Sequence, residues 1–356
     1  MTKKNRRVDP NLESDPFAER TAFLTRGAIS LLGGKFIFQS NSEELLALVD
    51  AAYAGLPDHL FSSASKTFRI NLLLTPKPVP NPIRRAARRV DPPPISMLQG
   101  AGFLGSATPS STFVVLHPEN RAGLVSASPE MLRFPYHVRY ELIEFAVFTL
   151  ACRAQGLVPL HGACVGLDGR GVLLMGPSGS GKSTVALQCL LEGLDFVSED
   201  SVFVAPNSMR ATGTPNFLHV REDSLHWVEQ LRIRSMIRKS PVIRRRSGVE
   251  KFEVDLRRKE FRLAKTPLRI IGVVFLSPRL AGTGPLLRPL SAGNTLARLK
   301  EEQAYGASLP QWATFNKKLL RLGGFEVFRG PHPSASVEAL RSLLVKDDIK
   351  SHPSSG

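Results

Sequence analysis

The sequence predicts an α/β protein, with a mixed α+β sheet in the C-terminal part of the chain and a smaller α+β module before it. Three observations predict this division. A short apolar run, 171–175, leads through a Gly/Ser-rich loop into apolar residues at helical spacing, 184–193. A second strand pattern, 160–166, precedes this unit across the turn sequence 167–170, which is typical of a hairpin. Residues 27–128 carry strand and helix patterns of their own.

The N-terminal module is predicted from residue 21 to 128, after a polar tail at 1–20. Ser40-Asn-Ser-Glu43 is a capping-box pattern that opens an apolar-periodic helix from Leu45 to Tyr53. The Pro- and Arg-rich stretch 75–94 predicts an extended basic loop, because its prolines exclude a helix. The strands predicted in this module are 27–39, in two pieces around Gly33-Gly34, 67–74, 112–116 and 124–128.

The C-terminal domain is predicted from residue 129 to 345, followed by a polar tail at 346–356. It opens with a mostly apolar helix, 136–153, that Gly156 ends. A strand with two acids inside it, 196–204, follows the helix after the loop. The remaining predicted elements are a short helix around 225–228, strands at 251–256, 269–276 and 325–329, and helices at 294–302 and 335–345.

The composition is that of a soluble globular protein. The N-terminus is polar and lacks the apolar stretch of a secretory signal, and no apolar run approaches the ~20 residues that span a bilayer. Cys152, Cys164 and Cys189 stand in apolar surroundings with neither paired spacing nor nearby histidine ligands. Such cysteines indicate buried thiols in a reducing compartment, so we expect a cytoplasmic protein. The sequence leaves the oligomeric state open, a homo-oligomer included.

The formal net charge of +16 is spread unevenly along the chain. Between Arg232 and Arg262 there are 12 Lys and Arg against 4 Asp and Glu, a net charge of +8. Such a segment favours a polyanion, either nucleotide phosphates, an acidic peptide or nucleic acid, and the alternative is a solvated basic surface. Nucleic acid is the least favoured partner, because the basic segments have little aromatic interleaving and no recognised binding motif.

The loop after the 171–175 strand fits the phosphate-binding pattern G-x-x-x-x-G-K-[ST]. Glycines let successive backbone N–H groups turn toward phosphate oxygens, and the following helix adds the positive end of its dipole. Lys182 is expected to reach the β- and γ-phosphates and Ser183 to bind Mg²⁺. A Gly/Ser turn without a ligand is the alternative. The predicted site for ATP and Mg²⁺ consists of Gly176, Pro177, Ser178, Gly179, Ser180, Gly181, Lys182, Ser183 and Thr184.

Two adjacent acids, Glu199 and Asp200, interrupt the apolar strand 196–204. Burying both is costly unless a cation or a partner compensates them, and phosphoryl transfer needs carboxylates to hold Mg²⁺ and to accept a proton. We expect the return after the loop helix to bring this strand beside the strand that ends in the loop. Because neighbours on a regular strand point to opposite faces, both acids reach one site only if the strand ends or bulges there.

Four segments resemble the catalytic core of HPr kinase/phosphorylase and its HPr-kinase-like relatives. They are Leu160-His-Gly-Ala-Cys-Val165, Asp168-Gly-Arg-Gly171, the phosphate-loop pattern, and Phe196-Val-Ser-Glu-Asp-Ser-Val202. The resemblance covers residues 155–205 and, more faintly, the chain through 345. It implies a core similar to the nucleotide-binding half of ATP-dependent phosphoenolpyruvate carboxykinase. The N-terminal module does not share it.

The resemblance also implies an activity and the residues that perform it. The activity is ATP- and Mg²⁺-dependent phosphoryl transfer to a hydroxyl, on a Ser or Thr of a protein or peptide. Lys182 and Ser183 would hold the phosphates and the metal, with Asp200 as a second Mg²⁺ ligand. Glu199, which stands where the family usually has Asp, would be the base, and His161 would lie near the transferred phosphate.

Two other classes of protein remain as alternatives. A small-molecule kinase of the shikimate or nucleoside-monophosphate type also places acids on the strand after the loop helix, but in a parallel sheet and without the preceding Leu-His-Gly hairpin. A non-catalytic nucleotide-binding or nucleic-acid-binding protein would use the basic segments electrostatically.

Overall fold

The computed structural model describes residues 22–61, 65–75, 91–109, 112–177 and 179–345. Ser178 of the predicted phosphate loop lies outside the described residues, and so do the two predicted tails and most of the predicted basic loop. In the described part of the chain, every helix is too short or too polar to cross a membrane.

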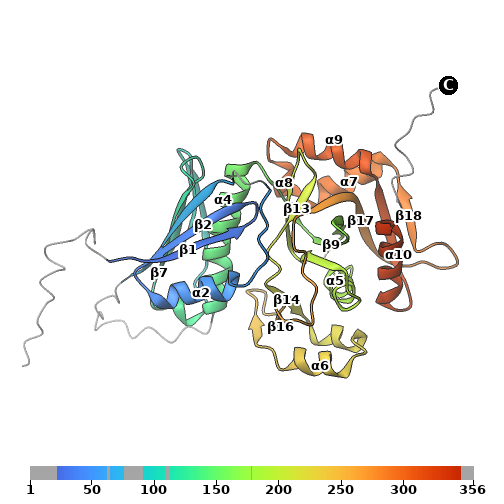
Figure 1. The fold of residues 1–356 in the computed structure, drawn as a ribbon, viewed down its shortest axis with the longest axis horizontal. Helices are drawn as coiled ribbons and strands as arrows, with labels where there is room; N and C mark the ends of the chain where they lie inside the picture. Colours follow the sequence, from blue (N-terminus) through green and yellow to red (C-terminus); the bar gives the residue numbers. More distant parts are fainter. Residues whose placement is uncertain (1–21, 62–64, 76–90, 110–111, 178, 346–356) are drawn as a thin grey trace, which may run out of the picture.

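The N-terminal strands form one seven-stranded sheet in the order β1-β2-β3-β7-β6-β5-β4 (Figure 1). The pairs β2–β3 and β3–β7 are parallel and the others antiparallel. Alternate side chains, among them Phe36, Phe68 and Val114, are fully buried on one face of the sheet, as the two-residue period of a strand requires. The bounds are β1 Leu24–Leu31, β2 Gly34–Ser40, β3 Thr67–Leu74, β4 Ser96–Gly100, β5 Phe103–Ala107, β6 Phe113–His117 and β7 Ala122–Ala127.

The first helix of this module, α2 (Glu43–Tyr53), has a different cap from the predicted one. Ser42 is the N-cap, and its side chain accepts the amide N–H of Leu45 at 3.4 Å. The hydroxyl of Ser40 instead accepts the amide N–H of Ser42 at 3.0 Å. The helix therefore starts two residues later than the capping-box pattern implies, because β2 extends through Ser40.

The predicted helix 136–153 is continuous but not regular. It consists of α3 (Pro135–His137), a seven-residue π-helix named η2 (Val138–Glu144) and α4 (Phe145–Gln155), and the left-handed Gly156 (φ 66°) ends it as predicted. Its apolar face belongs to the N-terminal core, together with the side chains of β2, β3, β6 and α2.

The predicted C-terminal domain, 129–345, includes this helix, whose apolar side chains pack in the core of the N-terminal module. α2 and α4 cover the same face of the seven-stranded sheet (Figure 1). α2 contacts β1, β2 and β3, whereas α4 contacts β6 and β7. Without the second helix, the apolar face of β6 and β7 would be open to water, which costs about 25 cal/mol for each Å² exposed.

A second, mixed sheet of nine strands carries the phosphate-loop segment. Its main path runs β11-β9-β10-β17-β13-β12-β8, with β19 and β18 joined to β17. β10 is parallel to β17, and the hairpin β9–β10 turns at Asp168 (φ 50°) and Gly169 (φ 79°), as predicted. The bounds are β8 Val158–His161, β9 Ala163–Leu167, β10 Arg170–Met175, β11 Asp195–Ser198, β12 Ser201–Ala205, β13 Arg210–Thr212, β17 Leu268–Leu280, β18 Leu287–Leu290 and β19 Gly324–Arg329.

Two expectations about this sheet are wrong. The pattern 160–166 is divided between β8 and β9, which pair with different strands, β12 and β10. The strand after the loop helix, β11, pairs with β9 and not with the loop strand β10. β10 already has a neighbour on each side, β9 and β17, so β11 can only extend the edge of the sheet.

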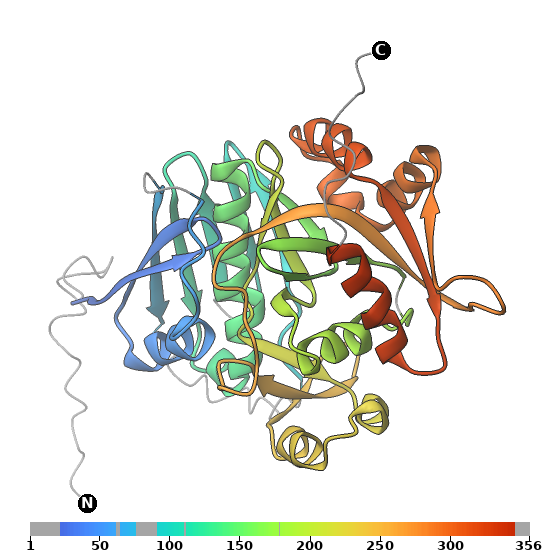
Figure 2. The same cartoon turned by 45° about the vertical axis from the view of Figure 1, so that its right-hand side comes forward.

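Helices cover both faces of the nine-stranded sheet (Figure 2). The loop helix α5 (Lys182–Leu191) and α10 (Pro333–Val345) pack together on one face. α7 (Ala292–Glu302), α8 (Ala304–Ala307) and α9 (Trp312–Leu322) lie on the other. Gly193, at φ 78°, follows the end of α5 as predicted.

The basic segment forms a separate small unit below the loop helix (Figure 1). Its three-stranded sheet has the order β14-β16-β15. The short helix η3 (Glu222–Trp227) lies where a helix around 225–228 was predicted. The other bounds are β14 Phe217–Val220, α6 Leu231–Arg238, β15 Val242–Arg244 and β16 Glu250–Asp255.

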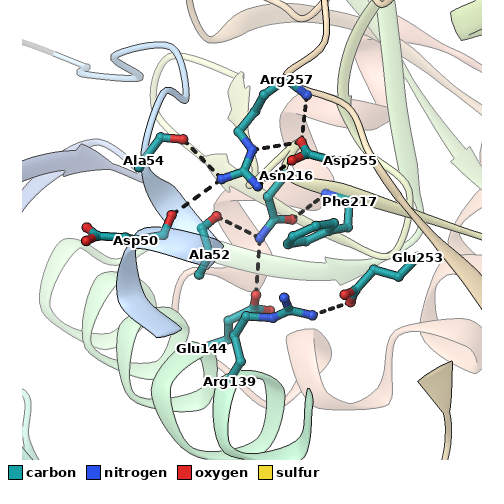
Figure 3. Close-up of polar contacts among 10 residues, drawn as sticks. All are labelled: Asp50, Ala52, Ala54, Arg139, Glu144, Asn216, Phe217, Glu253, Asp255 and Arg257. Carbon is teal, nitrogen blue, oxygen red and sulfur yellow. Dashed lines mark hydrogen bonds and ion pairs between the residues drawn. The ribbon is translucent and has the colours of Figure 1, made fainter. Parts of the chain in front are cut away.

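A buried polar network joins the N-terminal module to this small sheet (Figure 3). The amide of Asn216 donates to the carbonyl of Ala52, at the end of α2, and to Glu144 Oε1, at 3.0 and 3.3 Å. Arg257 donates to the carbonyls of Asp50 and Ala54 at 3.4 and 3.1 Å. Carbonyls at the C-terminus of a helix lack partners within it, and Asn216 and Arg257, which flank β14 and β16, supply donors at the end of α2.

Candidate functional site

The loop between β10 and α5 has the strand–loop–helix arrangement that the sequence predicts. Gly176, Gly179 and Gly181 adopt positive φ angles of 145°, 82° and 94°, which glycine tolerates because it has no Cβ. Lys182 begins α5, and its ammonium group donates to the carbonyl oxygens of Gly176 and Pro177. The lysine therefore bonds to the backbone of its own loop.

The next residues of the loop helix line a cleft of about 490 Å³. Lys182, Ser183 and Thr184 face it from α5, and Arg245 and Lys251 face it from the basic unit. Backbone N–H groups at a helix N-terminus and cations on the opposite wall together favour an anionic ligand. The arrangement is thus suited to phosphate groups.

Most of the basic segment does not form one free patch. Six arginines of the segment are in ion pairs with nearby acids, and only Arg245 among them faces the cleft. These six pairs are Arg232–Glu260, Arg238–Glu222, Arg245–Asp200, Arg246–Glu141, Arg257–Asp255 and Arg262–Asp195. The local pairing lowers the field that an acidic partner would meet, and among the cations of the segment only Arg245 and Lys251 face the cleft.

The two acids lie at a break in the chain between two strands. β11 ends at Ser198 and β12 begins at Ser201, so Glu199 and Asp200 occupy a bend. Both acids can reach one site only if the strand ends or bulges at them, and here the strand ends directly before Glu199. The break occurs because β11 pairs with β9 while β12 pairs with β8, at opposite ends of the sheet path.

The surroundings of these two carboxyls push their pKa values apart. Burial, and next the charge of Asp200, raises the pKa of Glu199 to about 8. Its Oε2 has no hydrogen-bond partner in the described part of the chain. Asp200 is exposed over 38% of its side chain. Desolvation, the largest single effect, raises its pKa, but the hydrogen bond from His161 and the charges of His161, Arg245 and His219 together lower it to about 2. At neutral pH, Glu199 is mostly protonated and Asp200 is ionised.

His161 is held in place from two sides. Its Nδ1 lies 3.0 Å from Asp200 Oδ1, and this hydrogen bond raises the pKa of the imidazole. The side-chain amide of Gln303 accepts the backbone N–H of His161 at 2.7 Å and donates to its carbonyl at 2.9 Å. The imidazole itself remains 64% exposed, so it is positioned and still accessible.

A second, larger cavity of about 810 Å³ meets the first at His161, which lines both. We call it the apolar groove. α4 and α8 form two of its walls, and the start of β4 and Phe203 of β12 contribute others. Asp200 lines it next to His161. His161 thus lies where a cleft lined by cations meets a groove lined largely by apolar side chains, and Asp200 lies beside it in the groove.

Sequence reasoning missed several residues at this junction. Glu302 Oε2 accepts the amide N–H of Gly176 at 2.6 Å, and Gln303 positions His161. Glu302 is the last residue of α7 and Gln303 comes directly after it, more than a hundred residues after the loop in the sequence. One feature of the sequence indicates Glu302. Glu301-Glu302 stands at the C-terminal end of a predicted helix, where the helix dipole makes carboxylates unfavourable. In the sequence, Arg245 and Lys251 are distinguished from the other cations of their segment by no local pattern.

Comparisons with known proteins give little further information. No family model matches the chain, and no curated protein matches it in sequence. Among solved structures, 51 chains match. One is the HPr(Ser) kinase/phosphatase from Coxiella burnetii, with 14% sequence identity, coverage of 52% of this chain and 95% of that chain, and a TM-score of 0.26. It is a weak structural neighbour, and the site described above does not depend on it.

Proposed function

We propose that this protein is an ATP- and Mg²⁺-dependent kinase that transfers the γ-phosphate to the hydroxyl of a Ser or Thr in a protein or peptide. The observation that carries the proposal is the meeting of the loop cleft and the apolar groove at His161. A phosphoryl donor in the first cavity and a hydroxyl in the second would face each other beside two carboxyls with different pKa values. Such a pair is a common mark of acid–base chemistry.

In the proposed reaction, the acceptor oxygen forms a bond to the γ-phosphorus. The bond from that phosphorus to the β–γ bridging oxygen breaks, and its electron pair leaves with ADP. The hydroxyl proton passes to the carboxylate of Glu199. Lys182 leaves the loop carbonyls and binds the β- and γ-phosphates, and Arg245 and Lys251 hold phosphate oxygens from the opposite wall.

The carboxyl assigned as base is the one whose pKa lies near neutral pH. A general base is most effective when its pKa is close to the working pH, and the pKa of Glu199 is about 8. Glu199 is buried at the bend, so its side chain has to turn toward the groove when the acceptor binds. His161 positions the acceptor oxygen at the junction.

The metal is assigned to Ser183 and Asp200. Mg²⁺ prefers hard oxygen ligands, and it usually takes one or two from the protein and the others from phosphates and water. A hydroxyl on the first turn of α5 and a carboxylate ionised down to a pH of about 2 fit this preference. The described residues contain no cluster of three or more His, Cys, Asp or Glu that would bind a metal alone. When bound, Mg²⁺ supplies positive charge at the transferring phosphate.

Nucleotide binding tests the first half of the proposal. Lys182→Ala and Ser183→Ala each remove a contact to a charged group, of about 1.5–3 kcal/mol. The affinity for Mg-ATP should therefore fall roughly tenfold or more in each variant. Lys265→Ala, at an exposed position outside the cleft, is the matched control and should bind as the wild type. Calorimetry that finds equal affinity in all four proteins would remove the phosphate-loop assignment.

A further inference from the structure

The apolar groove has the size and lining of a binding site for an extended chain. It holds about 810 Å³, and aromatic or aliphatic side chains line it from several elements. Phe145 and Phe148 belong to α4, Phe203 to β12, Tyr305 to α8 and Met97 to β4. His161 and Asp200, the groups next to the proposed transfer point, also line it. The π-helix η2 contributes Tyr140 to the same wall, and such segments are frequent at functional sites.

The charges in the groove disfavour an acidic occupant. Four carboxyls line it, against one arginine and one histidine. The arginine, Arg246, already binds both oxygens of Glu141 at 2.6 and 2.7 Å. Burial raises the pKa of Glu144 to about 7, so this carboxyl is partly protonated at neutral pH. An acidic segment would still meet the other carboxyls, with no free arginine in the groove lining to pair with. The four carboxyls are Glu141, Glu144, Asp200 and Glu302.

The edge of the N-terminal sheet indicates how a peptide would be held. β4 is the last strand in the sheet order, and no described strand pairs with its second edge. Met97 pairs with Ser106, which pairs with the buried Val114, so Met97 lies on the helix-covered face. It is nevertheless 70% exposed, because the helices do not reach this edge. A free edge beside an apolar groove is the arrangement that binds peptides by strand addition.

We propose that the groove binds an extended acceptor peptide that adds to the free edge of β4, with apolar, non-acidic residues on both sides of a Ser or Thr. The backbone of the peptide pairs with β4, alternate side chains enter the groove, and the hydroxyl reaches the junction at His161. This inference rests on the proposed function, since it identifies the class of acceptor for the same site. It favours an apolar acceptor over the acidic peptide that was one of the partners considered for the basic segment.

Two substitutions on β4 form a matched pair for the test. Met97 lines the groove, whereas Leu98 is on the opposite face of the same strand and is also exposed, at 53%. Met97→Asp adds a fifth carboxylate to the groove and removes one apolar contact, so it should weaken peptide binding about tenfold or more. Leu98→Asp adds the same charge to the same strand and should leave binding unchanged. Neither residue touches the nucleotide cleft.

The measurement is fluorescence anisotropy of labelled peptides without nucleotide, which separates this inference from the kinase proposal. Three peptides of equal length carry a central Ser with flanks of Leu and Phe, of Gly and Ser, or of Asp and Glu. We expect the apolar peptide to bind best and to lose affinity in Met97→Asp alone. Equal loss in both β4 variants, or equal binding of the acidic peptide, would overturn the inference. If the apolar peptide binds as expected but Mg-ATP does not bind, the groove assignment stands and the kinase proposal fails.

Discussion

Two neighbouring carboxyls with opposite pKa shifts are the chemical centre of the proposed site. Glu199 is buried with an unpartnered oxygen, and Asp200 is bonded to His161. The sequence predicted a role for both acids in one site, and a strand that ends or bulges where they occur. It did not predict which carboxyl would be protonated, because that depends on burial and on His161 and Arg245, which come from other elements.

The raised pKa of Glu199 predicts a pH dependence of folding stability. The group titrates near 4.5 when unfolded and near 8 when folded. Between these values the folded protein holds a proton that the unfolded chain releases, so stability falls as the pH rises through this window. Glu199→Gln cannot ionise and should lose less stability across it. Urea denaturation of both proteins at the two ends of the window measures the difference, and identical losses would show that Glu199 does not carry this shift.

At the scale of elements, the sequence predicts a turn or a helix end correctly when one short segment determines its backbone conformation. The turn at Asp168-Gly169, the glycines of the loop and the helix end at Gly156 all follow from backbone conformations that few residues adopt. The sequence of one segment does not predict which distant strand it pairs with. β11 lies at the sheet edge because β17, about seventy residues later, occupies the place beside β10.

The packing of the helix 135–155 predicts the behaviour of fragments. A fragment of residues 129–345 keeps this helix without the sheet that it covers, so Leu142, Val147 and Leu150, all at most 1% exposed in the full chain, would face water. We expect this fragment to aggregate, whereas residues 22–156 retain both partners and should fold. Soluble expression and circular dichroism of the two fragments are the measurement. A soluble 129–345 fragment that binds Mg-ATP would support the predicted boundary at residue 128 instead.

At the scale of the whole molecule, the N-terminal module is part of the proposed site. The polar network at the end of α2 fixes it to the basic unit (Figure 3), and the buried His59 adds bonds to Thr212 and to the carbonyl of Ala264 at 2.9 and 2.7 Å. The apolar groove exists only because the two parts meet. No pattern within one segment could have predicted it, which is why the sequence indicated a phosphate site but left the acceptor open.

The most direct test of the account is a single-turnover reaction with γ-labelled ATP, Mg²⁺ and the peptide with apolar flanks, in the wild type and in Glu199→Gln. We expect the label on the Ser hydroxyl, with a rate constant that rises with pH toward the pKa of Glu199, about 8. Glu199→Gln should bind Mg-ATP as the wild type does and transfer the label about 10²–10⁴-fold more slowly, without this pH dependence. A wild-type protein that binds Mg-ATP and the peptide but leaves the hydroxyl unlabelled would contradict the central claim, and an unchanged rate in Glu199→Gln would contradict its choice of base.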